Sequence, residues 1–321
     1  TYNGSSPFRA PATFAVIAHV EHALGAWHVR GGMHRIAEAE LALALSLGVE
    51  VETGVAVEAV ELEGGRVAGV RLAGGSRVAA DAVVVNADPA TAYERLLPER
   101  ADPTARRRLA GAEPSTSAFV MLAGVGRRLP ELSHHNVFFS SDYRREFDDL
   151  FARRRAPEDP TVYVSAASRT DASQAPAGCE ALFVMVNLPA LAGAEERDRV
   201  IARVRPRVFE RLARGGVEIG EGDVVHESYL TPSDFAARYG SRDGSLYGAS
   251  SNTRMQAFLR QPNRSRRVAG LYFCGGGAHP GGGIPLVTLS GMIAAREVEA
   301  RFTSGRRGSP RPRTARTARP V

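Results

Sequence analysis

The sequence predicts a mixed α/β and α+β protein in which a partial, Rossmann-like sheet domain is interrupted by an inserted α+β module. Two observations predict this fold class. Strand-like runs that end in glycine turns and lead into helical patterns occur near both ends of the chain, whereas Arg-rich helical patterns alternate with apolar strands in the middle. At 321 residues and 44% hydrophobic content, the chain is long enough to bury a large core.

The first helix is predicted over Met33–Leu47, where apolar residues recur at helical spacing after Arg30-Gly31-Gly32 and stop at Gly48. A strand and then a β-meander are expected next, because apolar and polar residues alternate between glycine turns. A fully apolar strand follows at Ala82–Val85. It ends at Asn86-Ala87-Asp88-Pro89, which is typical of a helix N-terminus.

The middle of the chain predicts a separate α+β module. Its helical patterns lie at Ala101–Gly111, Asp142–Arg155 and Arg197–Gly215, and its strand-like runs at Ser117–Gly124, Thr161–Ser165 and Ala181–Asn187. The last part returns to a strand at Val268–Phe273, a glycine-rich loop and a helix at Leu286–Val298. No internal repeat is visible.

Charge is concentrated at one end of the chain. The net charge is +6, and residues 302–321 contain six Arg and no acidic residue, so the remainder is balanced. A Pro- and Arg-rich segment cannot bury a core, and we expect a disordered, solvated tail rather than a nucleic-acid-binding arm. Weak attraction to anionic lipid headgroups is the alternative.

Several classes of site are not indicated. Two cysteines give no disulfide framework, and no histidine or cysteine spacing predicts a metal site. The sequence lacks a GxSxG elbow and a phosphate P-loop, and no run reaches the roughly 18 apolar residues that span a bilayer. The GxGxxG dinucleotide fingerprint is absent as well. The chain begins without Met in the middle of a pattern, so we expect a fragment.

The stretch "CGGGAHPGGGIPLVTLSG", residues 274–291, predicts a cofactor-binding site. Free N–H groups at a helix N-terminus attract an anionic group, and glycine lets a ligand approach the backbone. His279 within it is interpreted as holding the loop by a hydrogen bond in preference to donating a proton. The Gly31-Gly32 pair before the first helix repeats the pattern. Taken alone it is better explained as a simple turn, but together with the later loop it suggests two helix ends that face one cofactor.

These segments together resemble a known family. "RVAGLYFCGGGAHPGGGIPLVTLSGMIAA" is similar to the C-terminal signature of the bacterial phytoene desaturase family of FAD-dependent carotenoid desaturases, which have an amine-oxidase-type fold. "GAWHVRGGMHRIAEAELALALSLGVEVETGVAVEAVELEGGRVAGVRL", "ADAVVVNADPATAYERLL" and "TPSDFAARYGSRDGSLYGASSNTRMQAF" resemble the family in order, from Thr1 to Phe302. The last of these is most similar to members that desaturate hydroxylated or methoxylated carotenoids.

The resemblance implies a set of FAD-binding residues: Gly31, Gly32, Met33, Val57, Asn86, Ala87, Gly275, Gly276, Gly277, His279, Gly283, Ile284, Pro285 and Leu286. It also divides the chain into 1–30, the end of a substrate-domain segment; 31–90, part of the FAD-binding domain; 91–235, the substrate-binding α+β domain; 236–301, the C-terminal part of the FAD-binding domain; and 302–321, the tail. Two departures stand out: the N-terminal Rossmann unit is missing, and Ala278 replaces the family's Thr.

The implied reaction removes two hydrogens across a C–C bond of a lipophilic polyene, a carotenoid, and so extends its conjugation. The apolar runs "SAFVMLAGVG" and "ALFVMVNLPAL" would line a substrate channel, or serve equally as ordinary core strands. We expect a cytoplasmic enzyme in peripheral contact with a membrane and assign no catalytic acid or base. The alternatives are a carotenoid oxygenase, an isomerase or a retinol-saturase-like reductase, or a truncated non-catalytic remnant or a chain completed by a separate Rossmann half.

Overall fold

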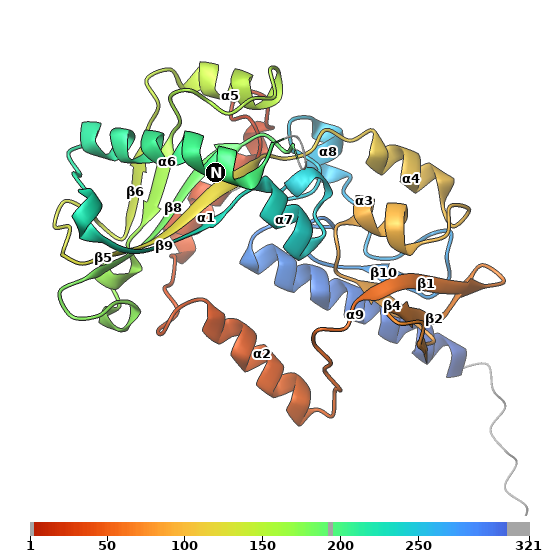
Figure 1. Cartoon of the computed structure of the whole chain (residues 1–321). Helices are drawn as coiled ribbons and strands as arrows, with labels where there is room; N and C mark the ends of the chain where they lie inside the picture. Colours follow the sequence, from red (N-terminus) through yellow and green to blue (C-terminus); the bar gives the residue numbers. More distant parts are fainter. Residues whose placement is uncertain (1–2, 192–194, 307–321) are drawn as a thin grey trace, which may run out of the picture.

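The computed structural model describes residues 3–191 and 195–306, which form two bodies side by side (Figure 1). One body is built on a five-stranded sheet and the other surrounds a small parallel sheet and a long C-terminal helix. Short helical turns lie between the strands and helices along the chain: η1 Ala12–Ala15, η2 Ala92–Leu96, η3 Ala167–Arg169, η4 Ala172–Gln174, η5 Glu221–Asp223 and η6 Arg242–Gly244.

The first body is formed by the middle part of the chain, for which the sequence predicts an inserted α+β module. Its antiparallel sheet has the order β6-β7-β8-β5-β9, with bounds β5 Ser117–Val125, β6 His135–Phe138, β7 Val162–Ser165, β8 Glu180–Leu188 and β9 Val224–Leu230. Helix α6, Arg197–Arg214, buries Val200, Val204, Val208 and Leu212, so one residue per turn enters the same core as the inner face of the sheet. Helix α5, Tyr143–Phe151, is shorter than predicted.

The second body contains the predicted meander, the apolar strand and the glycine-loop segment. Its strands are β1 Val57–Glu63, β2 Arg66–Leu72, β3 Arg77–Ala79, β4 Val83–Val85 and β10 Leu271–Phe273, and its helices are α3 Pro89–Thr91, α4 Pro103–Ala110, α7 Pro232–Tyr239, α8 Arg254–Phe258 and α9 Ile284–Arg306. Strands β4 and β10 pair in parallel. Tyr93, Leu97 and Leu109 pack in the core of this body, so residues 91–110 belong here and not, as the division at residue 91 predicts, to the inserted module.

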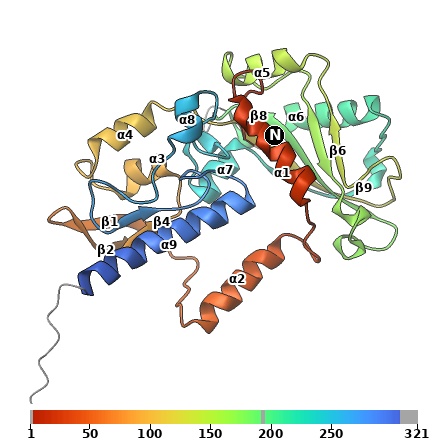
Figure 2. The same ribbon diagram turned by 180° about the vertical axis from the view of Figure 1, so that it is seen from behind.

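Helix α2, His34–Ser46, stands apart from both bodies (Figures 1 and 2). None of its residues is buried, and Leu47 just after it is 73% exposed. The strand predicted directly after this helix is not formed: residues 49–56 contain no strand, and Val49 and Val51 are exposed. A strand needs a neighbour to complete its hydrogen bonds. Within the described ranges only Ala56, at the end of this segment, is bonded to one, through the Ala73 N–H.

A helix lies near each end of the described chain. Helix α9 continues to Arg306, five residues into the segment for which the sequence predicts a disordered tail, and the rest of that tail lies outside the described residues. Helix α1, Val16–Leu24, has no buried residue. Of the helices in the described residues, none is long and apolar enough to cross a membrane.

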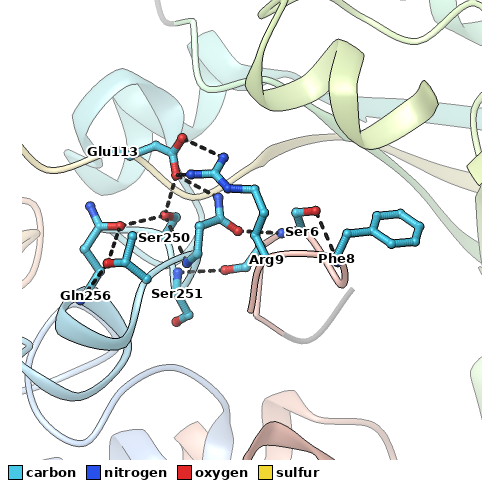
Figure 3. Close-up of polar contacts among 10 residues, drawn as sticks. Ser6, Phe8, Arg9, Glu113, Ser250, Ser251 and Gln256 are labelled. Carbon is cyan, nitrogen blue, oxygen red and sulfur yellow. Dashed lines mark hydrogen bonds and ion pairs between the residues drawn. The ribbon is translucent and has the colours of Figure 1, made fainter. Parts of the chain in front are cut away.

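A buried polar network ties the N-terminal segment to the second body (Figure 3). The Glu113 carboxylate accepts hydrogen bonds from both terminal nitrogens of Arg9, from the Ser250 hydroxyl at 2.9 Å and from the Asn252 amide at 2.7 Å. The Ser6 N–H donates to the Asn252 side-chain oxygen at 2.8 Å. One carboxylate therefore joins three segments that are far apart in the sequence.

Glu113→Ala should lower the free energy of unfolding by about 1–3 kcal/mol, because it leaves the buried Asn252 amide without an acceptor and the buried Ser250 hydroxyl with only its 3.2 Å bond to Gln256. Glu58→Ala is the control, since its ion pair with Arg71 is exposed on both sides and contributes little. Urea unfolding of the two variants checks this. Equal loss in both variants would contradict a structural role for the network.

Candidate functional site

The candidate site lies where the parallel strands β4 and β10 end. Because parallel strands point their carboxyl ends to the same edge of a sheet, the Asn86-Ala87 pair after β4 meets the glycine loop after β10. The loop, residues 274–283, leads directly into the first turn of α9. The structure therefore brings together two segments that are about 190 residues apart in the sequence and that were both predicted to bind the cofactor.

Two of the predicted loop glycines are required by the protein itself. A Cβ atom at Gly275 would lie 2.1 Å from the Asn86 side-chain oxygen, and one at Gly277 would lie 2.4 Å from Cδ of Pro89. Any larger residue would push the loop away from the end of β4. The sequence reasoning assigned these glycines to a ligand, whereas the structure shows that they first allow the two segments to pack.

Other loop glycines remain open. A Cβ atom at Gly276 would make only ordinary contacts, and one at Gly283 would meet no atom within 4 Å. Ile284, Pro285 and Leu286, the first residues of α9, are exposed. The N–H groups in a first helical turn lack intrahelical partners and carry partial positive charge. This part of the loop can therefore accept a ligand against its backbone, which fits the predicted flavin.

His279 holds the loop through its main chain rather than through its imidazole. Its N–H donates to the Gln261 carbonyl at 2.9 Å, and its carbonyl accepts from the Ser290 hydroxyl at 2.7 Å and the Asn263 amide at 2.9 Å. The residue is exposed, and none of the hydrogen bonds found among the described residues involves the imidazole ring. The prediction that His279 stabilises the loop is right in effect, but the group responsible is the peptide.

Asn263 is a residue that the sequence reasoning missed. Its side-chain amide is buried and reaches the carbonyl of Phe273 at 3.1 Å as well as those of His279 and Ser290. Because these acceptors belong to the end of β10, the loop and α9, one side chain determines how the strand leads into the helix. A single Asn in a polar turn gives no sequence signal for such a role.

The predicted Gly31-Gly32 turn packs against the inserted module. Both glycines have positive φ, and the Gly31 N–H donates to the Asp171 carboxylate at 2.8 Å. Hydrogen bonds from the Ser173 hydroxyl and from Gly31 hold the pKa of Asp171 well below its usual range. Gly32 lies beside the Gln174 side chain. Among the described residues, no hydrogen bond joins this turn to the glycine loop.

Met33 and Val57, the other two predicted cofactor residues, are exposed. Met33 directly precedes α2, and Val57 is the first residue of β1. The side chains of both residues are free of the core, and their predicted contact with a cofactor stays a prediction.

A histidine cluster lies next to the double-glycine turn. The ring centroids of His28 and His134 are 5.1 Å apart, and those of His134 and His135 are 4.3 Å apart. The His28 Nε2 atom lies 3.6 Å from Oδ2 of Asp171. Burial, with help from the two neighbouring rings, lowers the pKa of His134. Within residues 3–191 and 195–306, these groups and the other His, Cys, Asp and Glu side chains form no cluster that could hold a metal ion.

The five-stranded sheet has an apolar open face on the side away from α6. Adjacent strands place one row of side chains across this face: Val137, Tyr163, Met185, Val120 and Leu230. In the next row, Phe183 and Leu122 lie opposite each other and are 39% and 42% exposed. The interpretation as core strands is therefore confirmed for the face toward α6. On the other face Val120 is buried at 3% exposure while its neighbours are partly exposed, and the contact of this face with a substrate stays a prediction.

A parallel strand pair, a glycine loop and a helix N-terminus together define a nucleotide-cofactor-binding α/β protein. Comparison with known proteins gives the class. The model of the flavin-containing amine oxidoreductases matches residues 2–299. The chain belongs to this family, whose cofactor is FAD.

Relatives with assigned reactions act on carotenoids. The chain is 38% identical over 304 residues to 4,4'-diapolycopene oxygenase from Methylomonas, covering 93% of this chain and 60% of the relative. It is 39% identical over 298 residues to the zeta-carotene-forming phytoene desaturase of Myxococcus xanthus, covering 92% and 57%. The chain thus spans about three fifths of the length of these relatives.

The fold is shared with solved flavoenzyme-like structures at low identity. An oxidoreductase from Methanosarcina mazei has a TM-score of 0.57 at 18% identity, over 83% of this chain and 55% of that one. A putrescine oxidase variant has a TM-score of 0.52 at 16% identity, over 84% and 53%. At this identity the likeness describes the fold alone.

Gly277→Ala should destabilise the protein, whereas Gly276→Ala should not, because only the first places a methyl group against Pro89. We expect a loss of about 1–3 kcal/mol for Gly277→Ala, the usual cost of overpacking. Thermal unfolding of both variants checks this. Unchanged stability of Gly277→Ala would show that the loop does not pack on the end of β4 as described.

Proposed function

We propose that this chain supplies the glycine-loop part of an FAD site and the substrate-facing sheet of a carotenoid desaturase. The observation that carries the proposal is the pairing of an open glycine loop at a parallel strand edge with an apolar sheet face in the neighbouring module. The reaction is the removal of two hydrogens from a C–C bond of a carotenoid. The names of the relatives support this substrate class.

FAD, when bound, supplies the hydride-accepting chemistry. In this proposal the protein contributes position and environment. Asn86, Ala87 and the open glycines of the loop hold the cofactor through main-chain groups, and the first turn of α9 places its positive end toward developing negative charge. The double-glycine turn, fixed by Asp171, limits how far a bound ring system can move toward the inserted module.

The open face of the five-stranded sheet orients the substrate. A polyene is long, flat and apolar, and the row from Val137 to Leu230 crosses all five strands without a charged side chain. Binding there removes apolar surface from water on both partners and keeps water from the reacting carbon atoms.

A second reaction, carotenoid oxygenation, is favoured by a specific observation. Relatives named as oxygenases, from Methylomonas and from Staphylococcus haemolyticus, are 38% and 34% identical to the chain, in the same range as the desaturases. Both reactions would use the same cofactor site and an apolar substrate face; oxygenation would in addition need an oxygen source such as O2, and the products of the two reactions distinguish them.

Gly276→Ala should weaken FAD binding at least tenfold while leaving stability unchanged, because the added methyl group makes only ordinary contacts with Gly282 and Val287 but crowds the loop backbone that we propose contacts the cofactor. Gly291→Ala is the matched control, since its new methyl group meets no atom within 4 Å and lies in the body of α9. Quenching of flavin fluorescence measures the affinity, both on this chain and on a longer chain extended upstream to any GxGxxG-containing reading frame. Equal affinity in the two variants would argue against the loop as the cofactor site, and a lack of flavin binding by both the short and the extended chain would reject the proposed function.

Expression in bacteria that accumulate phytoene or later carotenoids identifies the reaction. A desaturase removes pairs of hydrogens and shifts the pigment absorption to longer wavelength, whereas an oxygenase adds oxygen to the product mass. Mass spectrometry of extracted pigments separates these outcomes. Unchanged pigments from a flavin-loaded protein would contradict both reactions.

A lipophilic substrate also requires access to a membrane, and we assign this contact to α1. Val16, Val20 and Leu24 recur every four residues and are exposed, and Trp27 beyond them is 87% exposed. An exposed apolar stripe ending in Trp is suited to the interface of a bilayer.

Replacing Leu24 and Trp27 with Ser should reduce cosedimentation with lipid vesicles several-fold, because Leu24 at the end of α1 and Trp27 just beyond it are the two most exposed apolar side chains of this stripe. Replacing Met255 with Ser, which removes an equally exposed apolar side chain elsewhere, is the control. Equal loss in both variants would indicate that vesicle binding does not depend on α1.

A further inference from the structure

An arginine-lined cavity lies beside the glycine loop, on the side formed by α4, η6 and α8. Its volume is about 450 Å³, and Gly277 contributes to its wall. The charged side chains that line it are Arg9, Arg108, Arg242, Arg260, Asp88 and Glu113. We propose that this cavity is a binding site for a phosphate-bearing small molecule. The proposal is independent of the carotenoid reaction.

The two carboxylates of the cavity already have partners. Glu113 accepts hydrogen bonds from Arg9, Ser250 and Asn252, as described above (Figure 3). Asp88 caps α3 by accepting from the N–H groups of Ala90 and Thr91 at 2.9 and 3.1 Å. Neither carboxylate is the ion-pair partner of one of the other three arginines.

Arg108 and Arg242 are therefore held by neutral acceptors. Arg108 donates to the Gln261 side-chain oxygen at 2.7 Å. Arg242 donates to the carbonyls of Leu109 and Ala110 at 2.6 and 2.8 Å. Asp243 lies 3.7 Å from it, and the Asp88 carboxylate in the same wall interacts with it at longer range without a direct ion pair. These bonds orient the guanidinium groups without cancelling their charge, and each group keeps further N–H donors.

Arg260 places a third cation at the inner end of the cavity. It donates to the carbonyls of Tyr247 and Gly276 and to the Ser251 hydroxyl, at 3.0, 3.2 and 3.2 Å. The described residues give it no carboxylate. Burial lowers the pKa of Arg260, as expected for a cation that is taken out of water without a counter-ion. A buried cation of this kind is costly unless an anion compensates it.

Ser245 provides a second, independent indication of a ligand. It lines the same cavity and is 2% exposed, yet its hydroxyl has no hydrogen-bond partner in the described residues. Buried hydroxyl groups are nearly always paired, since an unpaired one costs about 1–3 kcal/mol. This oxygen is itself inaccessible in the structure, so an oxygen-rich ligand in the cavity accepts its hydrogen bond once the hydroxyl turns toward the cavity.

The chemistry of the wall selects the ligand class. Three guanidinium groups around one space match the several acceptor oxygens and the double negative charge of a phosphate group. The cavity has the size of a small-molecule site and exceeds what one phosphate needs. Pro89, Met255 and Leu259 add apolar wall for an organic remainder.

The first test is thermal unfolding and calorimetric titration of the full chain at constant ionic strength, with inorganic phosphate, pyrophosphate and adenosine monophosphate as probes and citrate as the carboxylate arm. We expect saturable stabilisation by the phosphates and at least fivefold weaker binding in Arg108→Ala and in Ser245→Ala. Arg107→Ala is the matched control, because it removes a neighbouring exposed arginine of α4 that does not line the cavity.

The outcomes separate cleanly. Phosphate binding that weakens in the two cavity variants and not in Arg107→Ala supports the site. A lack of saturable response, equal effects in all three variants, or tighter binding of citrate than of any phosphate would overturn it. Competition between phosphate and FAD would show that the cavity is part of the FAD-binding site, and the proposal of a separate phosphate site would then be wrong. Failure of FAD to bind leaves the phosphate result unaffected.

Discussion

The geometry of the candidate site depends on the Asn263 side chain. Its amide bonds to main-chain carbonyls at the end of β10, in the glycine loop and in α9. A loop so rich in glycine has many accessible conformations, and its ordering costs more entropy than that of an ordinary loop. One buried side chain that bonds to three consecutive parts of the chain selects a single conformation and so sets the direction in which the helix N-terminus points.

The glycines of the loop serve two different purposes. Gly275 and Gly277 let the loop close on the residues after β4, whereas Gly276 and Gly283 leave backbone free on the open side. Glycine thus both allows the loop to pack at the end of β4 and leaves part of the loop backbone open to a ligand. This division also explains why the loop can lie close to Asn86 while a ligand still reaches it from the other side.

Local sequence patterns predicted most elements, and long-range contacts explain what they missed. Apolar strand-like runs predicted β5 and β8, and helical patterns predicted α6 and α2, because these patterns depend on local sequence alone. The strand expected after α2 did not form because pairing depends on a neighbour, which local sequence does not reveal. The contacts of Asp171, His28 and Asn263 join residues far apart in the chain, so no spacing rule could have found them.

The hydrogen bond from Gly31 to Asp171 ties the turn before α2 to the inserted module rather than to the glycine loop. The turn therefore belongs mechanically to the module that carries the apolar sheet face. When the two bodies shift relative to each other, as modules within one chain commonly do, the turn travels with the sheet. The separation of the turn and the glycine loop then changes with that single rigid-body motion, so it is coupled to the position of the apolar face.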